Sequence, residues 1–253
     1  MGPLRCLRIG CRLLPILACV PCFSADVCAP ADIHGAYGFQ LAGTTTISGK
    51  ETPIATVGRL VFDGAGSISG TSSVNFNGLF LGNPTTGSYE AKDDCSITFS
   101  LQDTSGAFQD FNGSSASGGD RAEIRQSDPR THVRGSMVRL PDSCTSSSFQ
   151  GEYHFTITGR ATPLASEGSK GSGDAKALAQ ADGYGNLLVT RGDAKTSGTY
   201  TVDSDCFVQL SFGLADGDSN TSIQLRGVLA DGGKELLAVE TDPEQVGSAR
   251  FSR

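Results

Sequence analysis

Few residues of this chain have the types and spacing that enzymes use. It contains three histidines, His34, His132 and His154, and none lies two or four residues from another. Metal-binding and catalytic motifs need closer sets, and no Gly-x-Ser-x-Gly, His-Glu-x-x-His or phosphate-loop pattern is present. We therefore predict no catalytic residue and no cofactor, and we interpret the histidines as solvent-facing residues of an ordinary scaffold.

One segment resembles the start of a calcium-binding loop. Asp216, Asp218 and Asn220 follow the Asp-x-Asp-x-Asn spacing of such loops. However, Thr221 replaces the glycine of position six and Gly227 replaces the glutamate of position twelve. A polar hairpin turn explains the segment better, so it is a weak calcium candidate and the sequence offers no other metal site.

The N-terminus has the features of a targeting segment. Arg5, Arg8 and Arg12 precede a short apolar stretch over 13–20, and small residues flank a cleavage point before Ala25. The stretch is too short to span a membrane. We predict a signal peptide over 1–24 and an exported protein, periplasmic, secreted or held at the cell surface. Lipid attachment at Cys19 is the disfavoured alternative.

The charge of the chain limits its partners. The formal net charge is −7, and removing a leader with three arginines and no acidic residue leaves −10. Nucleic acids and anionic membrane surfaces need a basic footprint. We therefore expect neither as a partner.

The elements that must position any site are written twice along the chain. The segment Gly87–Cys95 returns as Gly198–Cys206, with the shared pattern Gly-[Ser/Thr]-Tyr-x-[Ala/Val]-x-x-Asp-Cys. Gly-x-Tyr-x-Phe occurs at 35–39 and 151–155, and Asp-Gly-x-Gly at 63–66 and 182–185. The sequence therefore predicts a tandem repeat with domains over 25–140 and 141–253.

Each copy has the pattern of an all-β domain. Short segments of alternating polar and apolar residues are separated by turn residues, with one turn expected at Asn83-Pro84. The first copy contains about eight such segments: 34–42, 54–62, 66–76, 86–92, 95–101, 106–111, 120–126 and 132–139. We predict two eight-stranded antiparallel meander barrels, since closure removes exposed strand edges. Two β-sandwiches are the alternative.

Four cysteines, Cys28, Cys95, Cys144 and Cys206, remain after the leader. An even number in an exported chain indicates disulfides, and four cysteines allow three pairings. The duplication selects Cys28–Cys95 and Cys144–Cys206, because each ancestral copy had to fold with its own pair. Each bridge closes a loop of more than sixty residues, which the chain-entropy model values at about 4 kcal/mol.

The copies differ at the apolar segment Leu79-Phe80-Leu81. The second copy has Val189-Thr190-Arg191 thereabouts, so the shared fold does not require the segment. We expect it to pack against the core, with contact to a ligand at a barrel mouth or an interface as the alternative. The insertion over 169–179 is the second place where the copies differ and where a special activity should be sought.

Together these motifs resemble a group of exported bacterial proteins of unknown function, over nearly the whole chain after the leader. The group is similar to calycin-type barrels such as lipocalins, allene oxide cyclases and dirigent proteins. Gly-x-Tyr-x-Phe at 35–39 takes the place of the Gly-x-Trp of lipocalins, and no Thr-Asp-Tyr element follows. The resemblance implies a barrel fold and brings no activity with it.

The residues favour a non-enzymatic binding or interaction module. Its expected partner is a small apolar molecule held in a barrel interior, or a protein surface. Two alternatives stay open. One is an enzyme that shapes its substrate in a barrel pocket, such as a cyclase or isomerase, and the other is a structural spacer at the cell surface.

Overall fold

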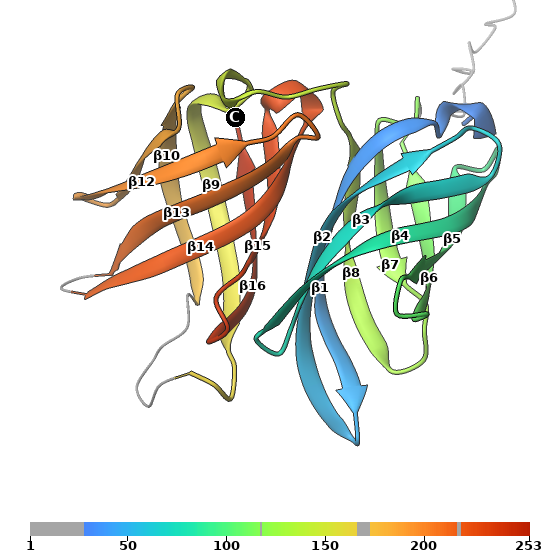
Figure 1. The fold of residues 1–253 in the computed structure, drawn as a ribbon, viewed down its shortest axis with the longest axis horizontal. Helices are drawn as coiled ribbons and strands as arrows, with labels where there is room; N and C mark the ends of the chain where they lie inside the picture. Colours follow the sequence, from blue (N-terminus) through green and yellow to red (C-terminus); the bar gives the residue numbers. More distant parts are fainter. Residues whose placement is uncertain (1–27, 117, 166–172, 217–218) are drawn as a thin grey trace, which may run out of the picture.

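A computed structural model of the protein describes residues 28–116, 118–165, 173–216 and 219–253. The predicted signal peptide and Cys19 lie outside these ranges. The described chain forms two closed eight-stranded antiparallel barrels, one after the other (Figure 1). This confirms the all-β prediction and selects barrels over sandwiches.

In the first barrel each strand pairs with the next, and β1 pairs with β8 to close the sheet. Its strands are β1 (Gly35–Ile47), β2 (Lys50–Phe62), β3 (Ser67–Phe76), β4 (Leu79–Ala91), β5 (Ser96–Asp103), β6 (Phe108–Ser115), β7 (Arg121–Gln126) and β8 (Thr131–Arg139).

The second barrel repeats this order and closes through the pairing of β16 with β9. Its strands are β9 (Gln150–Ala161), β10 (Asp174–Asp182), β11 (Asn186–Arg191), β12 (Ala194–Val202), β13 (Phe207–Asp216), β14 (Ser219–Ala230), β15 (Glu235–Glu240) and β16 (Gln245–Ser252). Three 3₁₀ turns, η1 (Pro30–Asp32), η2 (Ser146–Ser148) and η3 (Asp231–Gly233), complete the described elements. None of the described helices is long and apolar enough to cross a membrane.

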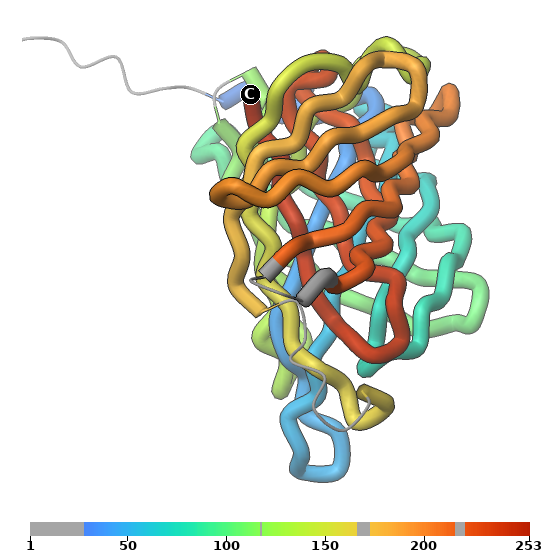
Figure 2. The backbone as a smooth tube through the Cα atoms, turned by 90° about the vertical axis from the view of Figure 1, so that its left-hand side faces the viewer, coloured from blue at the N-terminus to red at the C-terminus, as the bar shows by residue number. Residues whose placement is uncertain are grey.

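Two hairpins of the first barrel are longer than the sequence predicted. Ser48-Gly49 and Asn77-Gly78 have positive φ at both residues, which is the backbone of tight primed hairpin turns. These turns extend β1, β2 and β4, so the hairpin of β1 and β2 reaches beyond the rest of its barrel (Figure 2). The turn expected at Asn83-Pro84 is wrong, because that dipeptide lies within β4, opposite Ser72 and Thr71.

The interior of each barrel holds an aromatic core. In the first barrel Phe62 makes edge contacts with Tyr37, Tyr89 and Phe99, and Phe99 stacks on Phe111. In the second barrel Phe149 and Phe155 take the central places, with Tyr153, Phe212 and Phe251 around them. Both cores form because alternate strand residues point inward.

The repeated tyrosines close one end of each barrel. The hydroxyl of Tyr37 donates to the carbonyl of Gly119 at 2.7 Å, and that of Tyr153 donates to Gly233 at 2.6 Å. An arginine side chain lies over each ring, Arg139 in the first copy and Arg253 in the second. The Gly-x-Tyr-x-Phe motif is therefore shared scaffold.

The structure contains both disulfides expected from the duplication. Cys28 is bonded to Cys95 and Cys144 to Cys206, with Cα atoms 5.1 and 4.9 Å apart. Cys95 and Cys206 both have φ of 67°, so the two copies turn in the same way where the bridge attaches. Each bridge ties the segment before the first strand of its barrel to the turn before the fifth.

The two barrels pack on each other through their outer faces. An apolar cluster between them contains Val57 and Val138 of the first barrel and Val228, Leu237 and Val239 of the second, all at most 3% exposed. This interface fixes the spacing between the barrels, because protein interiors pack too densely for the two faces to slide freely.

Two amide side chains, one buried and one half-buried, fix the register of that interface. Asn75 is fully buried, and its amide donates to the carbonyls of Glu240 and Gln245, both at 2.8 Å. Gln40 donates to the carbonyls of Ala238 and, at 2.8 Å, Ala249. Leaving such groups without partners would be costly, so the two barrels have one preferred arrangement.

Candidate functional site

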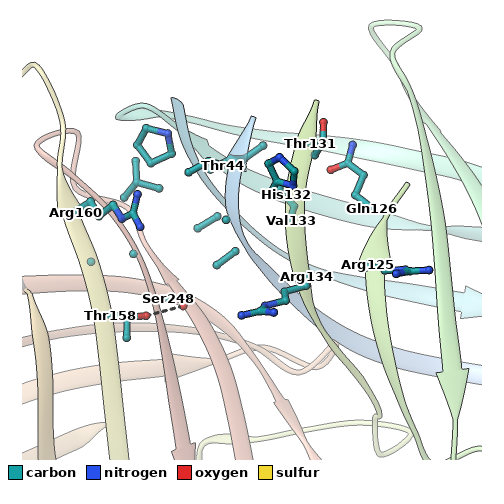
Figure 3. Close-up of a pocket in the computed structure, with 18 of the residues that line it drawn as sticks. Thr44, Arg125, Gln126, Thr131, His132, Val133, Arg134, Thr158, Arg160 and Ser248 are labelled. Atoms are coloured by element: carbon teal, nitrogen blue, oxygen red, sulfur yellow. Dashed lines mark hydrogen bonds between the residues drawn. The ribbon is translucent and has the colours of Figure 1, made fainter. Parts of the chain in front are cut away.

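A large hollow of the described surface lies between the two barrels. It is a groove of about 1060 Å³. One wall comes from β1, β2, β6, β7 and β8 of the first barrel, and the other from β9, β10 and β16 of the second (Figure 3). The interface described above places the two walls, so the groove exists only when both barrels are present.

Two arginines enter the groove from opposite sides. Arg134 on β8 and Arg160 on β9 both point into the space between the barrels, and His132 lies beside Arg134 on the same strand (Figure 3). All three side chains are exposed. His132 and Arg134 reach the outer face because Val133 between them is buried in the barrel, and alternate strand residues point to opposite sides.

A third arginine lies next to Arg134. Arg125 on β7 is directly opposite Arg134 in the antiparallel pairing. Like charges directly opposite each other on one face of a sheet are destabilising. The neighbours in the same row are Asn112 on β6 and Ala42 on β1, which carry no charge to compensate the pair.

These three arginines also lack acidic partners. Within the described residues Arg125, Arg134 and Arg160 make no ion pair and no side-chain hydrogen bond. Other arginines of the chain differ: Arg139 binds Asp120 at 2.7 Å, and Arg121 and Arg250 both bind Glu235. The groove therefore holds three guanidinium groups without an ion-pair partner in the described chain, on a protein whose net charge is negative, although Glu123 lies near Arg125 and Arg134.

The rest of the lining is mostly small and neutral. Thr158 and Ser248 pair across β9 and β16, with their hydroxyl oxygens 3.2 Å apart. One acidic residue, Asp174 on β10, also lines the groove, where it is paired with Thr158 on β9. Small residues without polar side chains complete the surface: Ala42, Gly43, Pro53, Ala55, Gly159, Val246 and Gly247.

The arginines of this groove suit the binding of an anion. Arginine stays protonated at all ordinary pH values, so its guanidinium cannot act as a general base, but it donates paired hydrogen bonds to carboxylates and phosphates. Arg134 and Arg160 point toward the same space and have no ion-pair partner among the described residues. A bound anion would accept hydrogen bonds from their guanidinium groups and reduce the repulsion between them.

The apolar segment predicted at Leu79-Phe80-Leu81 lies at the start of β4. Phe80 packs against the apolar cluster between the barrels. Leu79 and Leu81 are 57% and 44% exposed. Strand alternation places both on the same side of β4 as Tyr89, whose ring packs in the barrel core, so they lie on the inner face of the sheet where it extends beyond that core.

The remaining predicted residues give no site. Asp218 lies outside the described residues, as do the side chains of Asp216 and Asn220 and residues 169–172 of the insertion, whose remainder leads into β10. The described residues contain no group of three side chains that could hold a metal ion. His34 contacts the carbonyl of Ala31 at 2.9 Å, and His154 lies on an outer face of the second barrel.

The three groove arginines lie outside the landmarks that the two copies share, so the repeat pattern did not predict them as site residues. One sequence signal for this charge is the residue that precedes the repeated Gly-Ser dipeptide, at 135–136 in the first copy and 247–248 in the second. Arg134 precedes the first and Val246 precedes the second. The charge is therefore a special feature of the first copy, although the sequence alone does not place Arg160 opposite it.

Comparisons with known proteins give this fold no established function. No family model and no curated protein matches the chain. Among solved structures, Rv2717c from M. tuberculosis is similar with 12% identity and a TM-score of 0.26, over 89% of this chain and 98% of that one. A porin-like protein from Bacteroides uniformis is similar with 9% identity and a TM-score of 0.19, over 85% and 96%. Likenesses this weak carry no argument about function.

Proposed function

We propose that this protein is an exported, non-enzymatic binding module that holds an anionic ligand in the groove between its barrels. The observation that carries the proposal is that Arg134 and Arg160 point into the groove from opposite barrels (Figure 3), with Arg125 beside Arg134 in the lining, and that none of the three has an ion-pair partner among the described residues. The cost of two like charges placed directly opposite each other is offset when an anion binds them.

The compartment supports the same function. Two disulfides indicate an oxidising location outside the cytoplasm. Export through the predicted signal peptide would take the chain there. Each barrel has eight strands, which agrees with the resemblance to calycin-type barrels. Membership of that group is a prediction.

A titration with small anions tests the proposal. The melting temperature of the protein should rise with phosphate, sulfate or citrate at constant ionic strength, because a ligand that binds only the folded state stabilises it. Arg134→Ala and Arg160→Ala should each reduce the rise. Lys195→Ala, which removes a positive charge on β12 outside the groove, should leave it unchanged. Equal rises in all four proteins would refute the proposal.

A small apolar ligand at the mouth of the first barrel remains a second proposal. Its support is the exposure of Leu79 and Leu81, 57% and 44%. A fluorescent apolar dye should bind the wild-type protein, and Leu79→Ser combined with Leu81→Ser should abolish that binding without lowering the anion response. Unchanged dye binding by the double variant would end this second proposal.

A further inference from the structure

We infer that the ligand of the groove is an acidic oligosaccharide, a chain of sugar rings with carboxylate groups, that contacts both barrels at once. The inference rests on the proposed function and names the chemical class of the anion. It is carried by how charge, hydroxyl groups and small residues are distributed along the groove.

The positive charges lie in two separate places. Arg134 and its neighbour Arg125 belong to the first barrel, and Arg160 belongs to the second (Figure 3). A single small anion would be bound by hydrogen-bond donors that converge on one point. Charges on opposite walls instead match a ligand that has at least two anionic groups held apart by a spacer.

The rest of the groove surface matches sugar rings better than dense charge. It presents the hydroxyls of Thr44, Thr131, Thr158 and Ser248 and the amide of Gln126. Such groups donate and accept hydrogen bonds with neutral hydroxyls. The closely spaced charges of a polyphosphate would mostly lie against neutral hydroxyls, without a guanidinium partner, whereas a chain of uronic acids separates its carboxylates by rings that carry neutral hydroxyls.

The shape of the groove agrees with a chain of rings. Its volume of about 1060 Å³ is at the upper end of the range for small-molecule pockets, so it has room for more than one sugar. Three glycines line it, Gly43, Gly159 and Gly247, together with Ala42. Without long side chains, the flat face of a ring can approach the backbone closely.

Calorimetry with defined uronate ligands tests the inference on the full-length mature protein. We expect trigalacturonate to bind at least tenfold more tightly than galacturonate. Trigalacturonate with its carboxylates methyl-esterified should bind at least tenfold more weakly than the free acid, since the rings are kept and only the charges are removed. Tripolyphosphate should bind more weakly than trigalacturonate.

Arginine variants show whether both walls take part. Arg134→Gln and Arg160→Gln should each lower the affinity for trigalacturonate about tenfold, and Lys195→Gln should not change it. Circular dichroism of each variant checks that both barrels are folded. If galacturonate binds as tightly as the trimer, or tripolyphosphate binds more tightly, the inference is wrong while anion binding in the groove still holds. If none of these anions binds, the proposed function fails as well.

Discussion

At the scale of single residues, the arginines of the groove destabilise the fold by mutual repulsion and provide donors for an anion. Arg125 and Arg134 lie directly opposite each other on adjacent strands. Neither has an ion-pair partner in the described chain. Selection for stability alone would place an acid or a neutral residue at one of the two positions, so the pair is best explained by a bound anion.

Replacement of one arginine should therefore separate stability from binding. We expect Arg125→Ser to raise the free energy of unfolding by about 0.2–1 kcal/mol and to weaken anion binding. Urea unfolding without ligand and calorimetry with ligand measure the two effects. A loss of stability together with unchanged binding would show that the pair has a structural role.

At the scale of the elements, turn carboxylates explain the repeated Asp-Gly-x-Gly motif. One carboxylate oxygen of Asp182 accepts hydrogen bonds from the amides of Tyr184 at 2.7 Å and Asn186 at 3.0 Å. Asp63 does the same with Ala65 and Ser67 in the first copy. Hydrogen bonds from Asn186 and Ser67 are the largest influence on these carboxyls, and they hold the pKa of each below its ordinary value of 3.8.

These lowered pKa values make stability depend on pH in one direction. A carboxyl whose pKa is lower in the folded state stabilises the fold above its unfolded pKa, and this contribution is lost as the pH falls through the folded value. We expect the unfolding free energy to decrease below about pH 4. In Asp182→Asn the decrease should be smaller. Urea unfolding over a series of pH values measures it, and identical pH profiles would contradict this account.

Each disulfide should contribute to stability by a similar amount. The bridges span 67 and 62 residues, and the chain-entropy model gives about 4 kcal/mol for either. Replacing Cys144 and Cys206 together by serine should lower the unfolding free energy of the second barrel by about this amount, with a matching loss in the first for Cys28 and Cys95. Guanidinium unfolding of the two double variants measures both, and a change below about 1 kcal/mol would indicate that the core alone sets stability.

The sequence predicted these elements well because their signals are local. Asp-Gly turns, alternating strands and the paired cysteines act over a few residues or are repeated in the second copy. The turn at Asn77-Gly78 was missed because the turn signal was assigned instead to Asn83-Pro84, and the turn at Ser48-Gly49 lies in the stretch between the predicted strands 34–42 and 54–62, for which no strand was predicted. The groove could not be predicted, since Arg134 and Arg160 meet only through the packing of two separate barrels.

At the scale of the whole molecule, the barrels use different faces to meet each other. The first contributes β1, β2, β4 and β8, and the second contributes β13, β14, β15 and β16. If each barrel carried both of these faces, further protein molecules could add to the free faces without limit. In the second copy, however, His154 and Thr156 stand where the first has Gly38 and Gln40, and both are exposed. A polar, bulky face of this kind opposes a further copy.

Gly38 is the position most sensitive to this interface. A Cβ atom there would lie 2.5 Å from Cγ2 of Val228 in the other barrel. We expect Gly38→Val to loosen the contact between barrels and to lower the affinity for anions at least tenfold, with both barrels still folded. Gly82→Ala is the matched control, because its added Cβ meets nothing closer than 3.5 Å. Small-angle scattering and calorimetry measure the two effects, and full affinity in a loosened protein would contradict a site shared between the barrels.

The central claim is that an anionic chain lies between the barrels and contacts both. Amide chemical shifts of the isotope-labelled protein during titration with trigalacturonate test it most directly. The account predicts shifts that saturate together on both walls, at Thr44, His132 and Arg134 in the first barrel and at Thr158, Arg160 and Ser248 in the second. Shifts confined to one barrel, or located on the faces of β11 and β12 instead, would contradict it.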